Sequence, residues 1–374
     1  MKLLILGGTA WLGHRTALAA AAEGHRVTCA ARGISGPAPS GTRFLQVDRD
    51  AEDGLAAAAA EDWDAVIDVS RQPGQVRRAV RDLSASTDFY VFVSTGNVYA
   101  SQKEFGQDED SPLLPPLDRE VMESMDSYGP AKVACERTVT EAFDVGSRAI
   151  VRAGLIGGPG DTSGRSGYWP LRFAYPSDDG GRVLVPAAGS QPTQLIDVRD
   201  LAEWLICVAR ERTPGVFNAT GHTVPFAGHL ETAARVAAAY RASPGDDAAV
   251  SAAPPMGPVH LVEAPGEWLA EQSVNEWSGP RSLPLWLSDP DWHGMNARSN
   301  QRALAAGLNL RSLADTLADT LEWEAEQCGN SGSGGSRRAG LEPQEERELL
   351  ALLDAERRDA GGTAAAGKDP QGRR

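Results

Sequence analysis

The chain has 374 residues with a formal charge of −15, and 41% of them are hydrophobic. This length is enough for one large α/β domain or two smaller ones. No stretch approaches the roughly 18 consecutive apolar residues of a membrane span, so we expect no membrane segment.

Charge and residue usage exclude further classes of protein. The tail after Gly329 holds eight basic and eight acidic residues, so the rest of the chain carries the negative excess and would repel nucleic acid. Four widely separated cysteines without a C-x-x-C pair predict reduced thiols in a cytoplasmic protein. Six histidines without an H-x-x-x-H pair predict that no metal is bound.

The first element expected is a buried parallel strand at residues 3–6, followed at once by the glycine turn GGTAWLG and an alanine-rich helix at 16–23. Such a turn lets backbone approach a diphosphate, and the helix presents free N–H groups to that anion. The pattern G-x-x-A-x-x-G therefore predicts a dinucleotide site, although an ordinary tight turn is the alternative. The residues expected to contact the cofactor here are Gly7, Thr9, Ala10, Trp11, Leu12 and Gly13.

The second strand, at residues 27–31, ends at Arg32, where a dinucleotide fold faces the adenosine ribose. An acidic residue there would accept from the 2′-hydroxyl of NAD, whereas a guanidinium suits the 2′-phosphate of NADP. We therefore expect NADP(H) to be preferred, with NAD(H) also accepted. Asp48, after a third strand at 43–47, could meet the adenine edge.

Strands and helices then alternate, with helices at residues 51–61 and 75–84 and strands at 63–70 and 89–93. This alternation predicts an α/β fold with a doubly wound parallel sheet. Val69, near the end of the fourth strand, is expected to line the cofactor.

Three residues further on carry the expected chemistry. Thr95 follows the fifth strand, and Tyr128 and Lys132 stand four apart at the start of a later helix, so they share one face. A lysine ammonium one turn away stabilises a phenolate, which allows a tyrosine to exchange a proton with a carbinol as hydride moves. The Thr95 hydroxyl could hydrogen-bond the same oxygen. Asp126 or Ser127 can cap the helix, and Pro130 fits only in its first turn.

At this point the chain resembles the extended short-chain dehydrogenase/reductase superfamily, in its NAD-dependent epimerase/dehydratase group. The resemblance covers roughly residues 1–325. It is carried by the glycine turn and by the segments at residues 92–99, 128–132, 152–161, 194–202 and 215–221. It implies a Rossmann-type sheet with a smaller C-terminal substrate-binding α/β region. It also implies that Thr95 binds substrate oxygen, Tyr128 is the acid/base, and Lys132 binds ribose and tunes the tyrosine.

Departures from the family pattern bear on the reaction. Ala10 replaces the middle glycine, and Ala153 replaces a proline that lies near the nicotinamide in the family. Gly96 and Asn97 stand where sugar-nucleotide dehydratases have an Asp-Glu pair, which argues against a dehydratase. Gly154 and Leu155 stand where epimerases often have an asparagine, which leaves that substrate class open.

The second half is expected to recognise the substrate. We expect a dinucleotide-binding domain at 1–155, a mainly substrate-binding region at 156–328 with 190–221 returning to the sheet, and a linker, charged helix and disordered tail at 329–374. The polar loop at 161–169 could clamp a polar, sugar- or nucleotide-like small molecule, or its tryptophan could pack in the core. A homodimer is also open.

The sequence thus favours an NAD(P)-dependent oxidoreductase acting on a secondary alcohol or ketone. One alternative is a sugar-nucleotide epimerase that uses transient hydride transfer. Another is a non-catalytic dinucleotide- or RNA-binding relative, which the Tyr128/Lys132 pair and the acidic balance disfavour.

Overall fold

A computed structural model describes residues 1–242, 258–330 and 339–366. The chain forms two compact units. Unit 1 comprises residues 1–160, 192–224 and 289–312, and unit 2 comprises residues 161–191, 225–288 and 313–374.

Unit 1 is built on a seven-stranded parallel sheet with the order β10-β6-β5-β4-β1-β2-β3. The order reverses direction between β1 and β4, so the carboxyl ends of these strands flank the point where such sheets bind ligands. The strands are β1 (Lys2–Leu6), β2 (Arg26–Ala31), β3 (Arg43–Gln46), β4 (Ala65–Asp68), β5 (Tyr90–Thr95), β6 (Arg148–Ala153) and β10 (Gly215–Ala219). The expected α/β class and doubly wound parallel sheet are confirmed.

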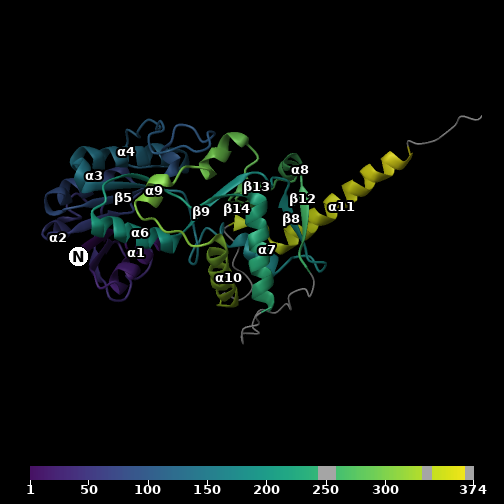
Figure 1. Ribbon diagram of the computed structural model, residues 1–374, viewed down its shortest axis with the longest axis horizontal. Helices are drawn as coiled ribbons and strands as arrows, with labels where there is room; N and C mark the ends of the chain where they lie inside the picture. Colours follow the sequence, from purple (N-terminus) through teal and green to yellow (C-terminus); the bar gives the residue numbers. More distant parts are fainter. Residues whose placement is uncertain (243–257, 331–338, 367–374) are drawn as a thin grey trace, which may run out of the picture. The chain divides into compact units, whose positions relative to one another are not determined.

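Helices cover both faces of this sheet (Figure 1). They are α1 (Trp11–Ala22), α2 (Ala56–Ala59), α3 (Pro73–Leu83), α4 (Tyr128–Ala142), α6 (Val198–Glu211) and α9 (Gln301–Ala305). Short 3-10 turns are η1 (Ser84–Ser86), η2 (Gly96–Val98), η3 (Met125–Ser127), η4 (Val145–Ser147) and η5 (Pro290–Asn296).

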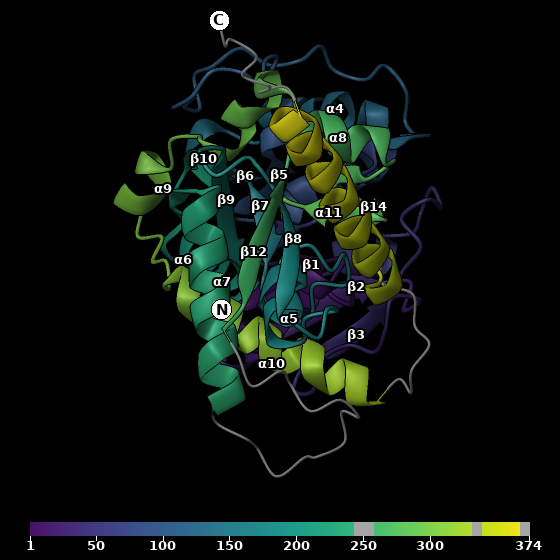
Figure 2. The same cartoon turned by 90° about the vertical axis from the view of Figure 1, so that its right-hand side faces the viewer.

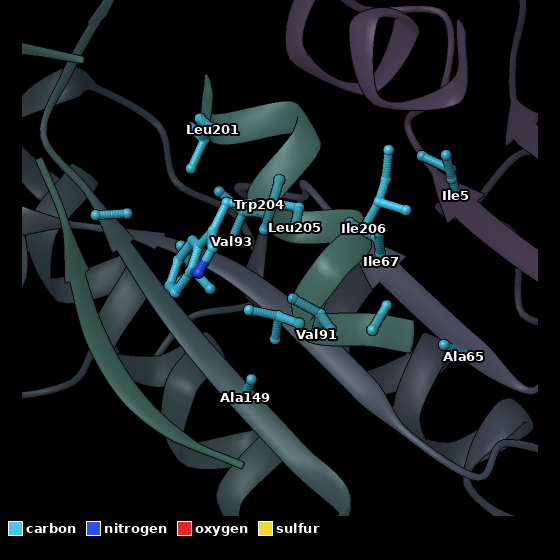
Figure 3. Close-up of a cluster of buried hydrophobic side chains, with 14 of the residues drawn as sticks. Ile5, Ala65, Ile67, Val91, Val93, Ala149, Leu201, Trp204, Leu205 and Ile206 are labelled. Atoms are coloured by element: carbon cyan, nitrogen blue, oxygen red, sulfur yellow. The ribbon is translucent and has the colours of Figure 1, made fainter. Parts of the chain in front are cut away.

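Alternation along β1 divides the core into two layers. Leu3 and Ile5 pack with α1 and α6, and Figure 3 shows the α6 residues Leu201, Trp204 and Leu205 in this layer. Leu4 and Leu6 point to the opposite face and pack with residues of α3 and α4. Because both faces are covered, the strand is apolar at every position, as a parallel strand requires.

Two expected elements are shorter than the sequence suggested. The helix expected at residues 51–61 is reduced to α2, because the chain before it makes successive turns, with Ala51 N bonded to Asp48 O and Gly54 N to Ala51 O. The fourth strand ends at Asp68, whose side chain accepts a hydrogen bond from Ser70 N and so turns the chain.

A second, three-stranded sheet in unit 1 has the order β11-β9-β7. Its strands are β7 (Leu155–Gly157), β9 (Pro192–Asp197) and β11 (Thr223–Pro225).

The described residues of unit 2 form three strand pairs and the remaining helices (Figure 2). The strands are β8 (Arg182–Pro186), β12 (His260–Ala264), β13 (Asn275–Trp277), β14 (Gly279–Pro280), β15 (Ser282–Pro284) and β16 (Ala339–Gly340). The helices are α5 (Tyr168–Ala174), α7 (Phe226–Ala242), α8 (Gly266–Glu271), α10 (Leu313–Asn330) and α11 (Pro343–Ala366).

A buried carboxylate joins helix α11 to the rest of unit 2. Glu346 is fully buried and lies 3.3 Å from Arg172 Nε, and it accepts hydrogen bonds from Ser177 Oγ and Leu184 N. Most of the expected linker at 329–336 lies outside the described residues. The tail was expected to be disordered from residue 360, but α11 continues to Ala366.

The described residues were expected to hold neither a membrane-spanning helix nor a metal site. None of their helices is both long and apolar enough to cross a bilayer. Residues 1–242, 258–330 and 339–366 contain no cluster of three or more His, Cys, Asp or Glu side chains suited to a metal ion.

Candidate functional site

The glycine turn after β1 has no room for side chains at its glycines. Gly7 has φ +93°, and a Cβ there would lie 2.6 Å from Val69 Cγ2. A Cβ at Gly8 would lie 2.7 Å from Cys29 Sγ, and one at Gly13 would collide with the carbonyl oxygen of Gly7. The backbone is therefore closely packed here, which is how a dinucleotide turn brings its N–H groups near a diphosphate.

The first turn of α1 is left open for an anion. Ala10 is the N-cap residue, its side chain is exposed, and no side chain caps this end. The free N–H groups and the positive end of the helix dipole fit a diphosphate. Trp11 Nε1 donates to Pro159 O at 3.0 Å, while Thr9 is buried and Leu12 half-buried beside it. These residues fit a nicotinamide dinucleotide.

The two residues expected at the adenosine end lie at the surface. Arg32 follows β2 with its side chain 52% exposed, and its Nη1 is 3.9 Å from Asp50 Oδ2. Asp48 is exposed after β3, and its Oδ1 accepts from Asp50 N at 3.0 Å. Both side chains can reach a ligand, but Asp50 is a nearby competing carboxylate for Arg32.

Thr95 ends β5 and is nearly buried. It is the N-cap residue of η2, and its Oγ1 accepts from Asn97 N at 3.3 Å. This bond uses a lone pair and leaves the hydroxyl hydrogen available to a substrate oxygen.

Tyr128 is the first residue of α4 and is half-buried. Pro130 lies in the first turn, as its missing N–H requires. The expected capping is wrong for Ser127, whose hydroxyl donates to Ser124 O at 2.9 Å, and no side chain caps the helix. A Cβ at Gly129 would collide with Asn97 O, so glycine lets the start of α4 approach η2.

Lys132 is held rigidly between two strand ends. Its Nζ donates to Ser70 O and Val93 O, both at 2.6 Å, and lies 4.6 Å from the centre of the Phe92 ring. The side chain is buried, and the two carbonyl oxygens stabilise its charge without neutralising it. One lysine thus joins the ends of β4 and β5 to the helix that begins at Tyr128.

A buried network beneath β5 was not predicted from the sequence. Arg152 Nη2 lies 2.8 Å from Glu136 Oε2, and Glu136 Oε1 accepts from Ser94 Oγ at 2.5 Å. Arg152 also donates to Tyr99 Oη, whose hydroxyl donates to Asn218 Oδ1 at 2.6 Å. The network ties β5, α4, β6 and β10 together and so fixes the strand that carries Thr95.

A second cluster of polar side chains, also not predicted, lies where the end of β4 meets the loop after β3. Arg49 Nη1 is 3.1 Å from Asp68 Oδ1 and also bonds Ser70 Oγ, while Tyr90 Oη donates to Asp68 Oδ2 at 2.9 Å. The same Ser70 offers its carbonyl oxygen to Lys132. The sequence hint of the Arg49–Asp68 pair is Asp68 itself, a carboxylate within the apolar run at residues 65–69.

The aromatic residues of the loop at 161–169 pack in the interior of unit 2. Tyr168 and Trp169 are fully buried within unit 2. Trp169 Nε1 donates to Pro284 O at 2.8 Å, and its ring packs against Phe173 and Phe226. Packing in the core, the second of the two interpretations of this loop, fits these contacts.

Comparisons with known proteins identify a family that the chain matches. The sequence model of the NAD dependent epimerase/dehydratase family matches residues 3–220. No curated protein matches the chain in sequence.

Several solved structures share the fold at low sequence identity. The UDP-glucose 4-epimerase of Thermotoga maritima, solved with UDP-glucose, is 15% identical with a TM-score of 0.59, covering 87% of this chain and 99% of its own. The UDP-glucuronic acid 4-epimerase of Bacillus cereus, solved with NAD, is 13% identical with a TM-score of 0.57 and coverages of 87% and 99%. The UDP-N-acetylglucosamine 4-epimerase of Bacillus cereus is 14% identical with a TM-score of 0.57 and coverages of 86% and 96%.

The family match spans more than half of the chain and includes the glycine turn, Thr95, Tyr128 and Lys132. The chain therefore belongs to the NAD dependent epimerase/dehydratase family.

Proposed function

We propose that this protein transfers hydride between a bound nicotinamide dinucleotide and a secondary alcohol of a sugar nucleotide. The observation that carries the proposal is Lys132, a buried cation held 2.6 Å from Ser70 O and Val93 O, one helical turn from Tyr128. An ammonium held here supplies positive charge on the helix that begins at Tyr128.

Each residue then has a distinct role. Tyr128 takes the hydroxyl proton of the substrate as the carbon gives up hydride, and returns it in the reverse direction. Thr95 donates its free hydroxyl hydrogen to the same oxygen and orients the carbinol. Lys132 holds the ribose side of the cofactor and supplies positive charge. When bound, the nicotinamide supplies the hydride-accepting carbon.

Epimerisation is the outcome that we favour over net oxidation or reduction. The family match and the 4-epimerase neighbours support it better than the net oxidoreductase that the sequence alone favoured. Gly96 and Asn97, which carry no acid after Thr95, argue against a dehydratase.

We also propose that Arg32 lets the site accept NADP(H). Its side chain is half exposed at the end of β2, and a 2′-phosphate would displace the loose contact with Asp50. Four similar solved structures are described with NAD, so the affinities for NADPH and NADH are measured side by side.

Product analysis tests the reaction. The protein is incubated with NAD or NADP and, separately, UDP-glucose, UDP-glucuronate or UDP-N-acetylglucosamine, and the products are followed by proton NMR and absorbance at 340 nm. We expect an inverted ring carbon with no net reduced cofactor. Stoichiometric accumulation of reduced cofactor would instead identify a dehydrogenase, and no product from any of these would contradict the sugar-nucleotide assignment.

A further inference from the structure

Arg298 is a buried cation that the proposed chemistry does not use. It follows η5 in unit 1 and is 4% exposed. Arg152 is equally buried, but its charge is neutralised by Glu136, whose Oε2 lies 2.8 Å from Arg152 Nη2. Among the residues that the structure describes, no carboxylate pairs with Arg298. The Tyr99 ring, whose centre lies 5.2 Å from Arg298 Cζ, faces the cation, but no carboxylate neutralises it.

The hydrogen bonds of Arg298 are also incomplete. Nη1 donates to Met295 O at 2.7 Å and Nη2 donates to Gln102 Oε1. Nε is buried and has no partner in the described part of the chain. Burial lowers the pKa of this guanidinium to about 10. A buried cation with an unmet donor is strongly stabilised by an oxyanion, because charge and hydrogen bond are then satisfied together.

The guanidinium lies beside the proposed reaction centre. It packs on Gly96, where an added Cβ would lie 2.8 Å from Arg298 Cζ. Gly96 directly follows Thr95, and the next residue, Asn97, contacts Gly129 beside Tyr128 through its carbonyl oxygen. The cation therefore borders the peptide segment that links Thr95 to the start of α4, and the glycine at 96 makes room for it.

We propose that Arg298 binds a carboxylate carried by the sugar ring of the substrate, so that the protein selects nucleotide-linked uronates over neutral nucleotide sugars. This inference rests on the proposed function, because it assumes that the sugar approaches Thr95 and Tyr128. A guanidinium matches a carboxylate with two parallel hydrogen bonds, which gives selectivity as well as affinity.

Binding measurements test the inference without requiring turnover. Dissociation constants for UDP-glucuronate, UDP-glucose and UDP are measured by calorimetry on the full chain saturated with cofactor. We expect the wild type to bind UDP-glucuronate at least tenfold more tightly than UDP-glucose. Arg298→Met removes this preference and leaves UDP binding within about twofold, and Arg298→Lys keeps part of it.

The matched control is Arg302→Gln on the same segment. Arg302 is 43% exposed at its side chain and is paired with Asp110, so its loss keeps the preference for the uronate. Cofactor affinity reports that each variant is folded. If Arg298→Met does not fold, the reduced preference of Arg298→Lys decides.

Three results would overturn the inference. They are no preference in the wild type, a full preference retained by both Arg298 variants, and an equal loss of affinity for all three ligands, which would place the diphosphate at Arg298. Failure of the proposed chemistry looks different, because turnover and its dependence on Tyr128 would then be absent while the Arg298-dependent preference persists.

Discussion

Two buried arginine–glutamate pairs, one in each unit, have the same chemistry and different consequences. In unit 1, Arg152 and Glu136 join β6 to α4 below the end of β5. In unit 2, Arg172 and Glu346 join α5 to α11. Both pairs are almost completely removed from water, so each costs desolvation that only good geometry repays.

The surroundings of the pairs differ. In unit 1 the neighbouring buried cations, Lys132 and Arg298, have no carboxylate partner in the described residues and lie near Thr95. In unit 2 the carboxylate of Glu346 neutralises Arg172, also accepts from Ser177 Oγ and Leu184 N, and fastens a helix. Positive charge left unneutralised at the strand ends points to ligand binding, whereas complete neutralisation points to structural support.

The largest effect should follow removal of the phenol in unit 1. We expect Tyr128→Phe to lower turnover by about 10⁴-fold, because no other group of the site replaces the acid/base. The melting temperature and cofactor affinity should stay close to wild type, since the ring remains. Steady-state kinetics on the substrate identified by product analysis, with calorimetric titration of the cofactor, measure this, and near-normal turnover would refute the role of Tyr128.

The next effect should be confined to unit 2. We expect Glu346→Gln to reduce stability by roughly 3–5 kcal/mol, because Arg172 is then left buried without a countercharge. Hydrogen exchange should rise in α11 and β8, while peptides around Lys132 keep their protection.

The control for this variant is Glu348→Gln on the same helix. Glu348 is exposed, so we expect a change within ±0.5 kcal/mol. Unchanged exchange of α11 in Glu346→Gln would mean that the buried pair does not fasten the helix.

A smaller effect should appear in the pH dependence of the stability of unit 2. His229 on α7 is fully buried without a partner for either ring nitrogen in the described residues, and burial lowers its pKa to about 4. Because the pKa of His229 in the folded protein lies below the unfolded value of about 6.5, the unfolded state takes up the proton first. The free energy of unfolding is therefore unaffected by this group above pH 6.5 and decreases below it. About 3 kcal/mol should be lost as pH falls toward 4.

Denaturation of wild type and His229→Leu between pH 4 and 8 measures this dependence. The variant should lose less stability on acidification, and should be at least as stable as wild type at pH 7.5 because it buries no unpaired nitrogen. The same pH slope in both proteins would exclude His229 as the source.

The smallest effect concerns the cofactor. We expect Arg32→Ala to weaken the binding of NADPH about tenfold, or by roughly 1.4 kcal/mol, because only NADPH has a 2′-phosphate. The binding of NADH should hardly change. Asp50→Asn should act in the opposite direction, since it removes the carboxylate near Arg32. Equal losses for both cofactors in Arg32→Ala would remove the basis for an NADP preference.

The sheet could be predicted because parallel strands are apolar on both faces and stand out as short runs. The apolar stretch of β1 followed by Gly7, Gly8 and Gly13 predicted both the strand and the turn that follows. The ends of helices were less predictable where turns compete with regular structure. The alanines of α2 favour a helix, but the residues just before α2 form turns instead.

The candidate site could be predicted only as far as local spacing reaches. Tyr128 and Lys132 are one helical turn apart, so their shared face follows from the sequence. Arg298 lies 202 residues after Gly96, and Glu346 lies 174 residues after Arg172, so no periodicity connects them. Such partners are set by tertiary packing, and a lone arginine in the sequence carries no signal of burial.

The reaction in D₂O, with the substrate that product analysis identifies, tests the central claim most directly. Because hydride leaves the reacting carbon for the nicotinamide and returns from it, the inverted carbon should keep its original hydrogen, and proton NMR should show no deuterium there. Deuterium at that carbon would mean that the hydrogen leaves as a proton, and would contradict hydride transfer assisted by Tyr128.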